Sequence, residues 1–492
     1  MTDQPSVPGS AWSVPGGRSP ADPSARYLSG RLWQNLTVRL SVALAFADAS
    51  IVVVAMPEIV TRLHTSISQV TWVIMAYNLA LIVTAAAVIP FARRLDSTRA
   101  LIAGLGSFGL ASVGCGLADS MRVLVPLRCV QGVGGGLLLC ASLPMFAGMA
   151  RPGDSPLNGW SAAAAIGMAA GPALGGILTQ IFDWRAIFLA QAPVAALAVI
   201  LVVGVHVRSG SEPEKELAHS PSALDPLTAN ACLLLLSAGL ICALFLVVLV
   251  LIDVWLLTPL AAAAVLTTIP LATAIAERGV RRASSIALGG IGATLVAAGL
   301  IGLSFVTHRE VGWVMITLTL VGTGLGLAFP GLTTAALASV GPAAARAAKT
   351  IAARDAGIVL GLLVLTPVLV NQLNKAPNQA LPAATSAVLT APIPIGTKLS
   401  LAPGLVADYK HASQSELPDF GPTFTQASDG ATPPSQRTAL NALHEQLDSI
   451  VQRAATNAFK LPLRYGAIFA ILVLPLLGLR LRKSTPKSAE HV

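Results

Sequence analysis

Charged residues are scarce in this chain. Only 11% of its 492 residues are Asp, Glu, Lys or Arg, whereas 54% are hydrophobic, and the mean hydropathy is +0.72. A soluble globular protein carries about 25% charged residues, so this sequence lacks the polar residues needed to cover a water-exposed surface. The composition excludes a soluble enzyme and extensive disorder, and it indicates a polytopic membrane protein.

Motifs of metal, nucleotide and redox chemistry are also missing. The five cysteines lie in apolar runs without a Cys-x-x-Cys spacing, which is typical of small packing residues. There is no phosphate-binding loop and no His-Glu-x-x-His motif. Gly104-x-Gly106-x-x-Gly109 fits a dinucleotide-binding pattern, but no strand precedes it, so it indicates helix packing. We therefore expect no enzyme activity, metal, cofactor or nucleic-acid partner, despite a net charge of +9.

Apolar runs long enough to cross a bilayer are the main feature that is present. A hydropathy window predicts twelve helices, two of them in an almost unbroken apolar stretch that turns near Asp253. The helices are expected at 37–58, 69–91, 100–119, 123–149, 159–182, 186–207, 227–251, 256–276, 284–306, 312–340, 350–372 and 462–480. The fold class is therefore all-α.

The placement of Lys and Arg predicts the orientation. The connections on one face carry most of these residues, and the short connections on the other face carry only Arg62, Arg122, Arg185 and Arg309. Both termini are therefore predicted to be cytoplasmic, with the protein in the cell (inner or plasma) membrane. The segments are a polar tail (1–36), a six-helix bundle (37–207), a linker (208–225), helices 7–11 of a second bundle (226–372), an extracytoplasmic loop (373–461), helix 12 (462–480) and a basic tail (481–492).

The extracytoplasmic loop is unusually long. Its first part, up to about 436, is rich in Pro, Ala, Thr and Ser and is expected to be irregular or mobile. Its second part predicts an amphipathic helix at about 437–460, because apolar residues recur there every three or four positions. They are Leu440, Leu443, Leu447, Ile450 and Ala454. We expect this helix to lie on the outer rim of the bundle or over its outer mouth; alternatively, it docks a partner or a lipid.

Two charged residues lie inside predicted spans of the first bundle. Asp48 is about ten residues into the first helix, where a carboxylate costs a few kcal/mol unless it faces the protein interior. Arg128 lies in the fourth helix within Arg128-Cys-Val-Gln131-Gly132-Val-Gly134. Asp48 is either a protonatable group or permanently paired with a basic residue, and Arg128 is either part of a proton relay or a structural counter-ion.

The fifth helix contains closely spaced small residues around a proline. Its sequence Gly167-Met-Ala-Ala-Gly171-Pro172-Ala-Leu-Gly175-Gly176 is followed by Trp184-Arg185. Glycines four residues apart permit close backbone approach, and the proline permits a bend.

These motifs resemble the major facilitator superfamily, and in particular the drug:proton antiporter branch that usually has fourteen helices. The run from Asp48 to Ile59 follows the branch pattern Asp-x-Thr-Ile-Val-Asn-Val-Ala-Leu-Pro-x-Ile, with Val53 in place of Asn. The second half carries similar patterns at 322–330 and 354–361. The resemblance implies two six-helix bundles, proton coupling through Asp48 and Arg128, and an antiporter motif formed by Gly167, Gly171, Pro172, Gly175 and Gly176.

The family's gating loops are only partly preserved. The loop between helices 2 and 3 normally contains two glycines that are absent here, which weakens the expected gate of Arg93, Arg94, Asp96 and Arg99. The corresponding loop of the second half, with Glu277, Arg278 and Arg281, is better preserved. The chain is also about two helices shorter than the branch pattern between Gly176 and Arg281, which fits the count of twelve.

Few interior charges predict a mainly apolar substrate cavity. We expect its lining to include Trp72, Tyr77, Gln131, Phe329, Arg354 and Asp355. Arg354 and Asp355 form either a local ion pair or a second protonatable site. The predicted function is proton-coupled export of hydrophobic or amphiphilic compounds, drugs or lipids, with membrane lipids as surroundings and the proton gradient as driving force. The alternatives are counter-flow without protons, and a non-transporting scaffold or intramembrane enzyme on a degenerate transporter fold.

Overall fold

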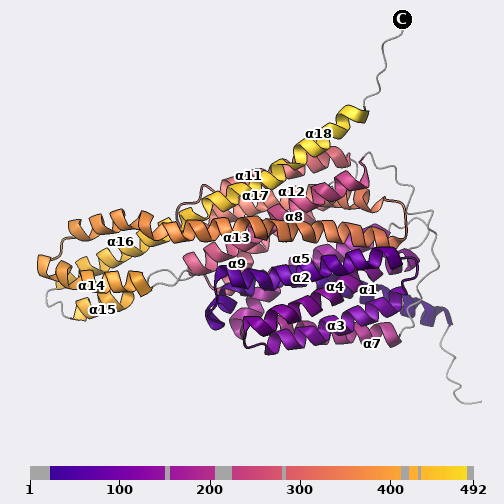
Figure 1. Ribbon diagram of the computed structural model, residues 1–492, viewed down its shortest axis with the longest axis horizontal. Helices are drawn as coiled ribbons and strands as arrows, with labels where there is room; N and C mark the ends of the chain where they lie inside the picture. Colours follow the sequence, from indigo (N-terminus) through magenta and orange to yellow (C-terminus); the bar gives the residue numbers. More distant parts are fainter. Residues whose placement is uncertain are drawn as a thin grey trace, which may run out of the picture.

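The computed structural model describes residues 23–149, 156–204, 224–279, 284–411, 420–429 and 434–484, and over these ranges the regular structure is helical. Twelve helices in these ranges are long and apolar enough to cross a membrane. Figure 1 shows them packed side by side with nearly parallel axes. The chain is therefore an all-α, multi-pass membrane protein, as the apolar runs predict.

The first half contains six of these spans. Its helices are α1 (Pro23–Arg62), α2 (Ile67–Phe91), α3 (Ser97–Leu117), α4 (Met121–Met149), α5 (Pro156–Ile181), α6 (Ala186–Leu189) and α7 (Gln191–Gly204), of which α6 and α7 form one span. Local signals fix where the helices begin: Ser66 and Gln69 form a capping box on α2, and Asp96 caps α3 by accepting from the amides of Thr98 and Arg99.

The second half contains the other six spans. Its helices are α8 (Pro226–Leu249), the π-helix η1 (Val250–Val254), α9 (Pro259–Leu266), α10 (Thr268–Gly279), α11 (Ser285–Leu303), α12 (Val311–Leu337), α13 (Ala343–Thr390), α14 (Ile395–His411), α15 (Gly421–Asp429), α16 (Pro434–Ala458), α17 (Lys460–Ile471) and α18 (Val473–Ser484). The apolar stretch at 226–276 divides just after η1, which contains Asp253, so the turn lies near the predicted position. Thr258 caps the following helix, with Pro259 in its first turn.

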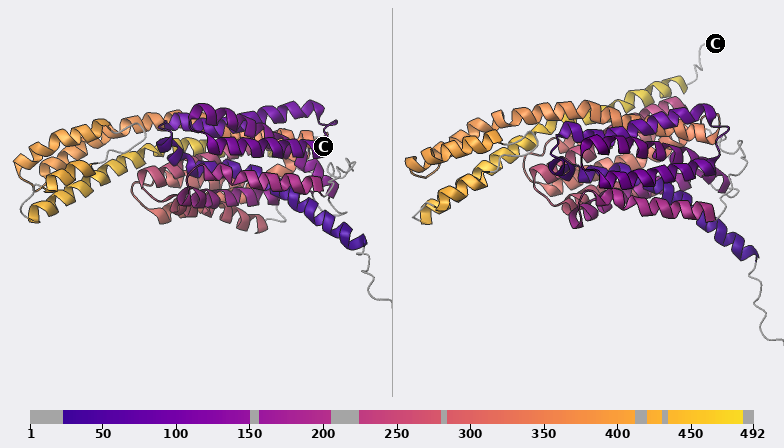
Figure 2. Two further views of the ribbon diagram at one scale, coloured as in Figure 1. Left: turned by 90° about the horizontal axis from the view of Figure 1, so that it is seen from below. Right: turned by 60° about the horizontal axis from the view of Figure 1, so that its bottom comes forward.

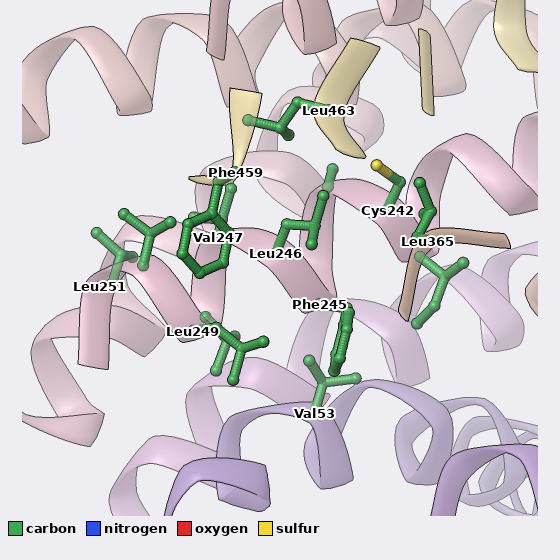
Figure 3. Packing of buried hydrophobic residues seen from close by; sticks show 14 of the residues in the cluster. Val53, Cys242, Phe245, Leu246, Val247, Leu249, Leu251, Leu365, Phe459 and Leu463 are labelled. Carbon is green, nitrogen blue, oxygen red and sulfur yellow. The ribbon is translucent and has the colours of Figure 1, made fainter. Parts of the chain in front are cut away.

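The two halves lie against each other along the length of the bundle. Figure 1 shows α1–α5 and α7 on one side and α8, α11, α12 and α17 on the other. In the close view of Figure 3, Val53 of α1 points toward Phe245 of α8, and both side chains are buried. Apolar side chains thus join the halves at this point.

The ends of the chain define one face of the bundle. α1 begins and α18 ends at the same end of the molecule, which we call the N-terminal face (Figure 1 and Figure 2). The connection between α2 and α3 lies at this face, because α1 runs away from it and α2 returns. Pro23 starts α1 in a position that suits proline, and the helix includes residues 23–36 of the predicted polar tail.

A helical stalk projects from the opposite face. It consists of residues 376–390 of α13 together with α14, α15 and α16, and both views of Figure 2 show it extending beyond the bundle. The prediction of an irregular or mobile segment up to about 436 is wrong for the described residues, because α13 continues to Thr390 and is followed by α14 and α15. The last span is likewise longer than 462–480, since α16, α17 and α18 follow one another almost without interruption.

Contact between α13 and α16 holds the stalk together. Ala376, Ala380 and Ala387 of α13 are buried and leave room for α16, whose buried side chains are Leu440, Leu443, Leu447, Ile450 and Ala454. Phe424 of α15 stacks on the ring of His444 at 4.8 Å. These are the apolar positions that the sequence assigns to one stripe. They face the stalk's own helices, and α16 extends away from the bundle rather than across its outer mouth.

Most of the predicted linker (208–225) and the end of the basic tail (485–492) lie outside the described residues, as does Arg281.

Candidate functional site

A buried ion pair joins α1 to α4. The Nη1 atom of Arg128 donates to both carboxylate oxygens of Asp48 at 2.9 Å, and neither side chain is exposed. The Nε atom of Arg128 donates to the carbonyl oxygen of Val73 on α2 at 2.9 Å. Three helices are thus connected by one guanidinium, and the sequence reasoning placed both charged partners inside the bundle.

An amide network surrounds the pair. Gln131 accepts from Arg128 Nη1 at 2.6 Å, and its own Nε2 lies 3.3 Å from Asp48 Oδ1, 2.8 Å from Ser112 Oγ and 2.9 Å from Gln191 Oε1. We call Asp48, Arg128, Gln131, Ser112 and Gln191 the polar cluster. Sequence reasoning missed Ser112 and Gln191, although Gln191 is a lone polar residue in a strongly apolar run, which is a usual sign of an interior role.

Tyr77 packs against this cluster through two glycines of α4. Added side-chain atoms at Gly132 or Gly135 would collide with the backbone or ring of Tyr77, so only glycine permits this close approach. The Tyr77 ring lies 4.5 Å from the Arg128 guanidinium carbon, a cation–π contact. Tyr77 therefore adjoins the polar cluster, of which Gln131 is a member, and neither residue lines the cavity described below.

The glycines of α5 form a smooth surface for α1. A Cβ atom at Gly167, Gly171 or Gly175 would meet the backbone or side chains of α1 at Ala43, Ala47, Ser50, Ile51 and Val54. Gly176 instead faces Pro259 and Ala263 of α9 in the other half. The predicted antiporter motif thus packs α5 against the helix that carries Asp48, and its last glycine lies at a contact between the two halves.

A mainly apolar cavity lies between the halves. Its larger part has about 730 Å³ of empty space, which includes space open to solvent, and is lined from α1, α5, α8, α10, α12 and α13, including Pro172 of the antiporter motif. A neighbouring part of about 680 Å³ shares Phe46, Met168, Phe329 and Arg354 with it and adds Asp355 and Glu277. Three predicted residues, Phe329, Arg354 and Asp355, therefore line this cavity.

Trp72 lies elsewhere. Its side chain is 48% exposed on α2 and lines neither part of the cavity. Arg354 and Asp355 do not form an ion pair within the described residues, because consecutive residues of a helix point in different directions. Arg354 instead lies 4.2 Å from the Phe46 ring centroid and donates to Met168 Sδ at 3.1 Å.

The candidate gating residues lie at the N-terminal face. The side chains of Arg93, Arg94, Asp96 and Arg99 are exposed, and Asp96 caps α3 and pairs with Arg99 at 3.2 Å. Glu277 lines the cavity and Arg278 is exposed. Beside this loop, α2 contacts α13 through alanines at Ala85, Ala92, Ala344, Ala345 and Ala348.

Comparison with known proteins agrees with this architecture. The sequence profile of the Major Facilitator Superfamily matches residues 39–368. The chain belongs to this superfamily. Membership indicates a transporter rather than an enzyme, and the matched region includes the polar cluster, the glycines of α5 and the cavity.

Relatives of this superfamily member include proteins named for resistance and export. It is 32% identical over 192 residues to the "Tetracenomycin C resistance and export protein" of Streptomyces glaucescens, and this aligned region covers 38% of this chain and 36% of the relative. It is 32% identical over 167 residues to the "Multidrug resistance protein Stp" of Mycobacterium tuberculosis (strain CDC 1551 / Oshkosh), covering 33% and 31%. Each match thus spans about a third of the relative's length.

Solved structures of the superfamily share the fold. A bacterial homologue of the human lysosomal transporter Spinster, in an inward-facing and occupied conformation, superposes with a TM-score of 0.60 at 14% identity, covering 95% of this chain and 100% of that chain. The xylose transporter XylE from E. coli gives a TM-score of 0.56 at 15% identity, covering 68% and 90%. At these identities the likeness concerns the fold alone.

Proposed function

We propose that this protein is a secondary active transporter that exports hydrophobic or amphiphilic compounds in exchange for protons. The observation that carries the proposal is the double role of α1. Phe46, Ala49 and Ser50 on this helix line the cavity between the halves, whereas Asp48 on its other side is held by Arg128. A change in the charge of Asp48 therefore acts on a helix that forms part of the cavity wall.

Coupling follows from the contacts of Asp48. When the carboxyl group takes up a proton, Arg128 loses its charged partner, and the attraction that holds α1 against α4 weakens. The glycines of α5 offer α1 a surface without side chains along which it can shift. The shift alters the cavity wall, which is what alternating access requires. The gating roles of Arg93, Arg94, Asp96, Arg99, Glu277, Arg278 and Arg281 remain part of this proposal.

Export from the cytoplasm across the plasma membrane is the proposed direction. It is supported by the names of the relatives, which concern resistance and export, and by the exposed arginines at the N-terminal face. Residues Arg93, Arg94, Arg99 and Arg278 are all exposed there, and such residues favour the cytoplasmic side. With this orientation both termini are cytoplasmic and the stalk is extracytoplasmic.

Reconstitution tests the proposal. Purified protein in liposomes, with the buffer more acidic on the side that the stalk faces, is expected to accumulate a fluorescent amphiphile there against its gradient. A protonophore abolishes the accumulation, and each cycle carries protons the other way. Transport that ignores the pH gradient but responds to a counter-flowing solute refutes proton coupling. If no panel compound moves, the non-transporting scaffold is favoured.

The stalk is a candidate docking site for an extracytoplasmic protein. On α14 the side chains of Ile395, Leu399 and Val406 are 76%, 69% and 52% exposed, and together with Ala402 they occupy one face at spacings of four, three and four. This face is opposite to Leu401, which is buried in the stalk. Such a stripe fits an apolar groove of a partner that receives the substrate.

Comparing cells with liposomes tests the docking proposal. The double variant Leu399→Glu/Val406→Glu is expected to lower export by cells severalfold but to leave transport in liposomes unchanged, because the partner is absent there. Ser400→Glu, on an exposed neighbouring position of α14, serves as the control. Equal export by cells carrying the double variant and the control contradicts a partner at this stripe.

A further inference from the structure

The unusual feature of the cavity is the Arg354 guanidinium: no carboxylate of the described residues forms an ion pair with it, although the neighbouring Asp355 attracts it through space. Among the described residues, Arg354 is the one charged residue that lines the larger part of the cavity. Within the described residues its sole hydrogen bond goes to the thioether of Met168, which is a weak acceptor, and its Nε atom is buried without a partner. Buried charged groups are normally paired, because leaving one unpaired carries a large desolvation penalty.

The other polar groups of this part of the cavity are already engaged. The Ser50 hydroxyl donates toward the carbonyls of Ala47 and Met168, and the Thr273 hydroxyl donates to those of Ile269 and Gly322 at 2.9 Å. Neither hydroxyl is oriented to serve Arg354. The free N–H groups of Arg354 are therefore the polar recognition element that this part of the cavity offers to a ligand.

Both halves of the protein surround this guanidinium. It extends from α13 in the second half and contacts Phe46 of α1 and Met168 of α5 in the first. A ligand bound to it is thus held at the point where the halves meet. The acidic residues Asp355 and Glu277 line only the neighbouring part of the cavity, which leaves the apolar walls of the larger part to the ligand's body.

We propose that Arg354 binds the anionic group of the transported compound, and that the substrates are amphiphiles with one carboxylate, sulfate or phosphate and an apolar body. This inference rests on the proposed transport function and specifies its substrate class. Guanidinium groups form strong, charge-assisted hydrogen bonds with such oxyanions. The apolar body contacts Phe329, Leu240, Leu244 and Pro172.

Binding measurements in zwitterionic nanodiscs separate this inference from transport. The probes are 11-dansylaminoundecanoic acid and its methyl ester, which share an apolar body but differ in charge, and signals from empty nanodiscs are subtracted. The wild-type protein is expected to bind the acid at least tenfold more tightly than the ester, a difference of about 1.4 kcal/mol. Equal binding of the two probes overturns the proposal, and so does stronger displacement of the acid by dodecyltrimethylammonium than by dodecyl sulfate.

Variants identify the residue responsible. Arg354→Gln is expected to remove the preference for the acid while leaving binding of the ester unchanged, whereas Arg354→Lys retains part of it. Arg122→Gln, an exposed arginine outside the cavity, is the control and keeps the full preference. A preference that survives Arg354→Gln refutes the assignment. If the acid binds through Arg354 but is not moved in liposomes, the proposed transport function fails while the binding site stands.

Discussion

Replacing Asp48 by asparagine separates the coupling role of the polar cluster from its structural role. Asn keeps the shape of Asp and one neutral acceptor, but it leaves Arg128 without the two charged contacts at 2.9 Å. Removing one partner of a buried ion pair costs about 3–5 kcal/mol. Because Gln131 and the Val73 carbonyl still accept from Arg128, we expect a cost near the lower end, about 3 kcal/mol.

The functional consequence differs from the structural one. Asp48 is fully buried and does not line the cavity, so Asp48→Asn is expected to bind amphiphiles still, but with the affinity of the state in which Asp48 is protonated. It has no carboxyl group that can exchange a proton, and its pH-driven accumulation in liposomes is therefore expected to be lost. Asp119→Asn, the same change at an exposed position, is the control and retains wild-type accumulation and melting temperature.

The double variant Asp48→Asn/Arg128→Gln completes the test. Removing both charges replaces the ion pair by neutral hydrogen bonds, so most of the lost stability is expected to return. If Asp48 couples protons, accumulation stays absent although the protein is stable. Recovery of both stability and accumulation refutes coupling through Asp48 and shows that the pair is a structural fixture. Unchanged accumulation by the single variant refutes it more directly.

Three further predictions concern packing. Gly171→Val places side-chain atoms on Ser50 and Ala47 of α1, which costs about 1–3 kcal/mol of stability. Its transport rate in liposomes is expected to fall at least tenfold. The control Gly106→Val, with no atom within 4 Å of its added Cβ, is expected to keep the wild-type rate. Leu443→Glu/Leu447→Glu buries charge between α16 and α13, so limited proteolysis should cut the stalk while the bundle stays folded. The control Ala442→Glu, at an exposed position, should resist proteolysis like the wild type. Resistance of the double variant to proteolysis contradicts the packing described. Replacing 376–435 by a short Gly/Ser linker exposes the apolar stripe of α16 and should cause aggregation, measured by size-exclusion chromatography. Replacing 376–452 removes most of the stripe and should give a monodisperse protein. If both proteins are monodisperse, the stripe does not need its partners in the stalk for solubility.

The sequence predicted the bundle well because a bilayer imposes simple rules. Spans need about 20 apolar residues, and charges between them mark the connections, so the first ten spans agree closely with the helices of the structure. A carboxylate and a guanidinium inside such spans are expected to face the protein interior and pair with each other, because an unpaired charge in the membrane is costly. Asp48 and Arg128 could therefore be placed in the interior, although the partners Ser112 and Gln191 depend on helix packing that no single span reveals.

Cavity residues were harder to predict, since in a membrane both the lipid-facing and the inward-facing side of a helix are apolar. Trp72 and Phe329 look alike in sequence, yet Trp72 is half exposed on the outside of α2 and Phe329 lines the cavity. The relation between Arg354 and Asp355 was similarly ambiguous, because adjacency along the chain suggests pairing whereas helix geometry separates the two side chains.

The stalk shows how tertiary contact overrides local preference. Residues 376–390 contain Pro377 and Pro382, which disfavour a helix interior, together with many small residues, and the segment therefore resembles an irregular linker. In the structure the same small residues permit α13 to continue, because buried Ala376, Ala380 and Ala387 lie at helical spacing against the leucines of α16. The alanine spacing was the available signal, but it becomes meaningful only beside the stripe of α16, which lies about 60 residues further along the chain. Because α13 carries both Arg354 in the cavity and residues 376–390 of the stalk, a rigid shift of this helix would move the stalk together with the cavity wall.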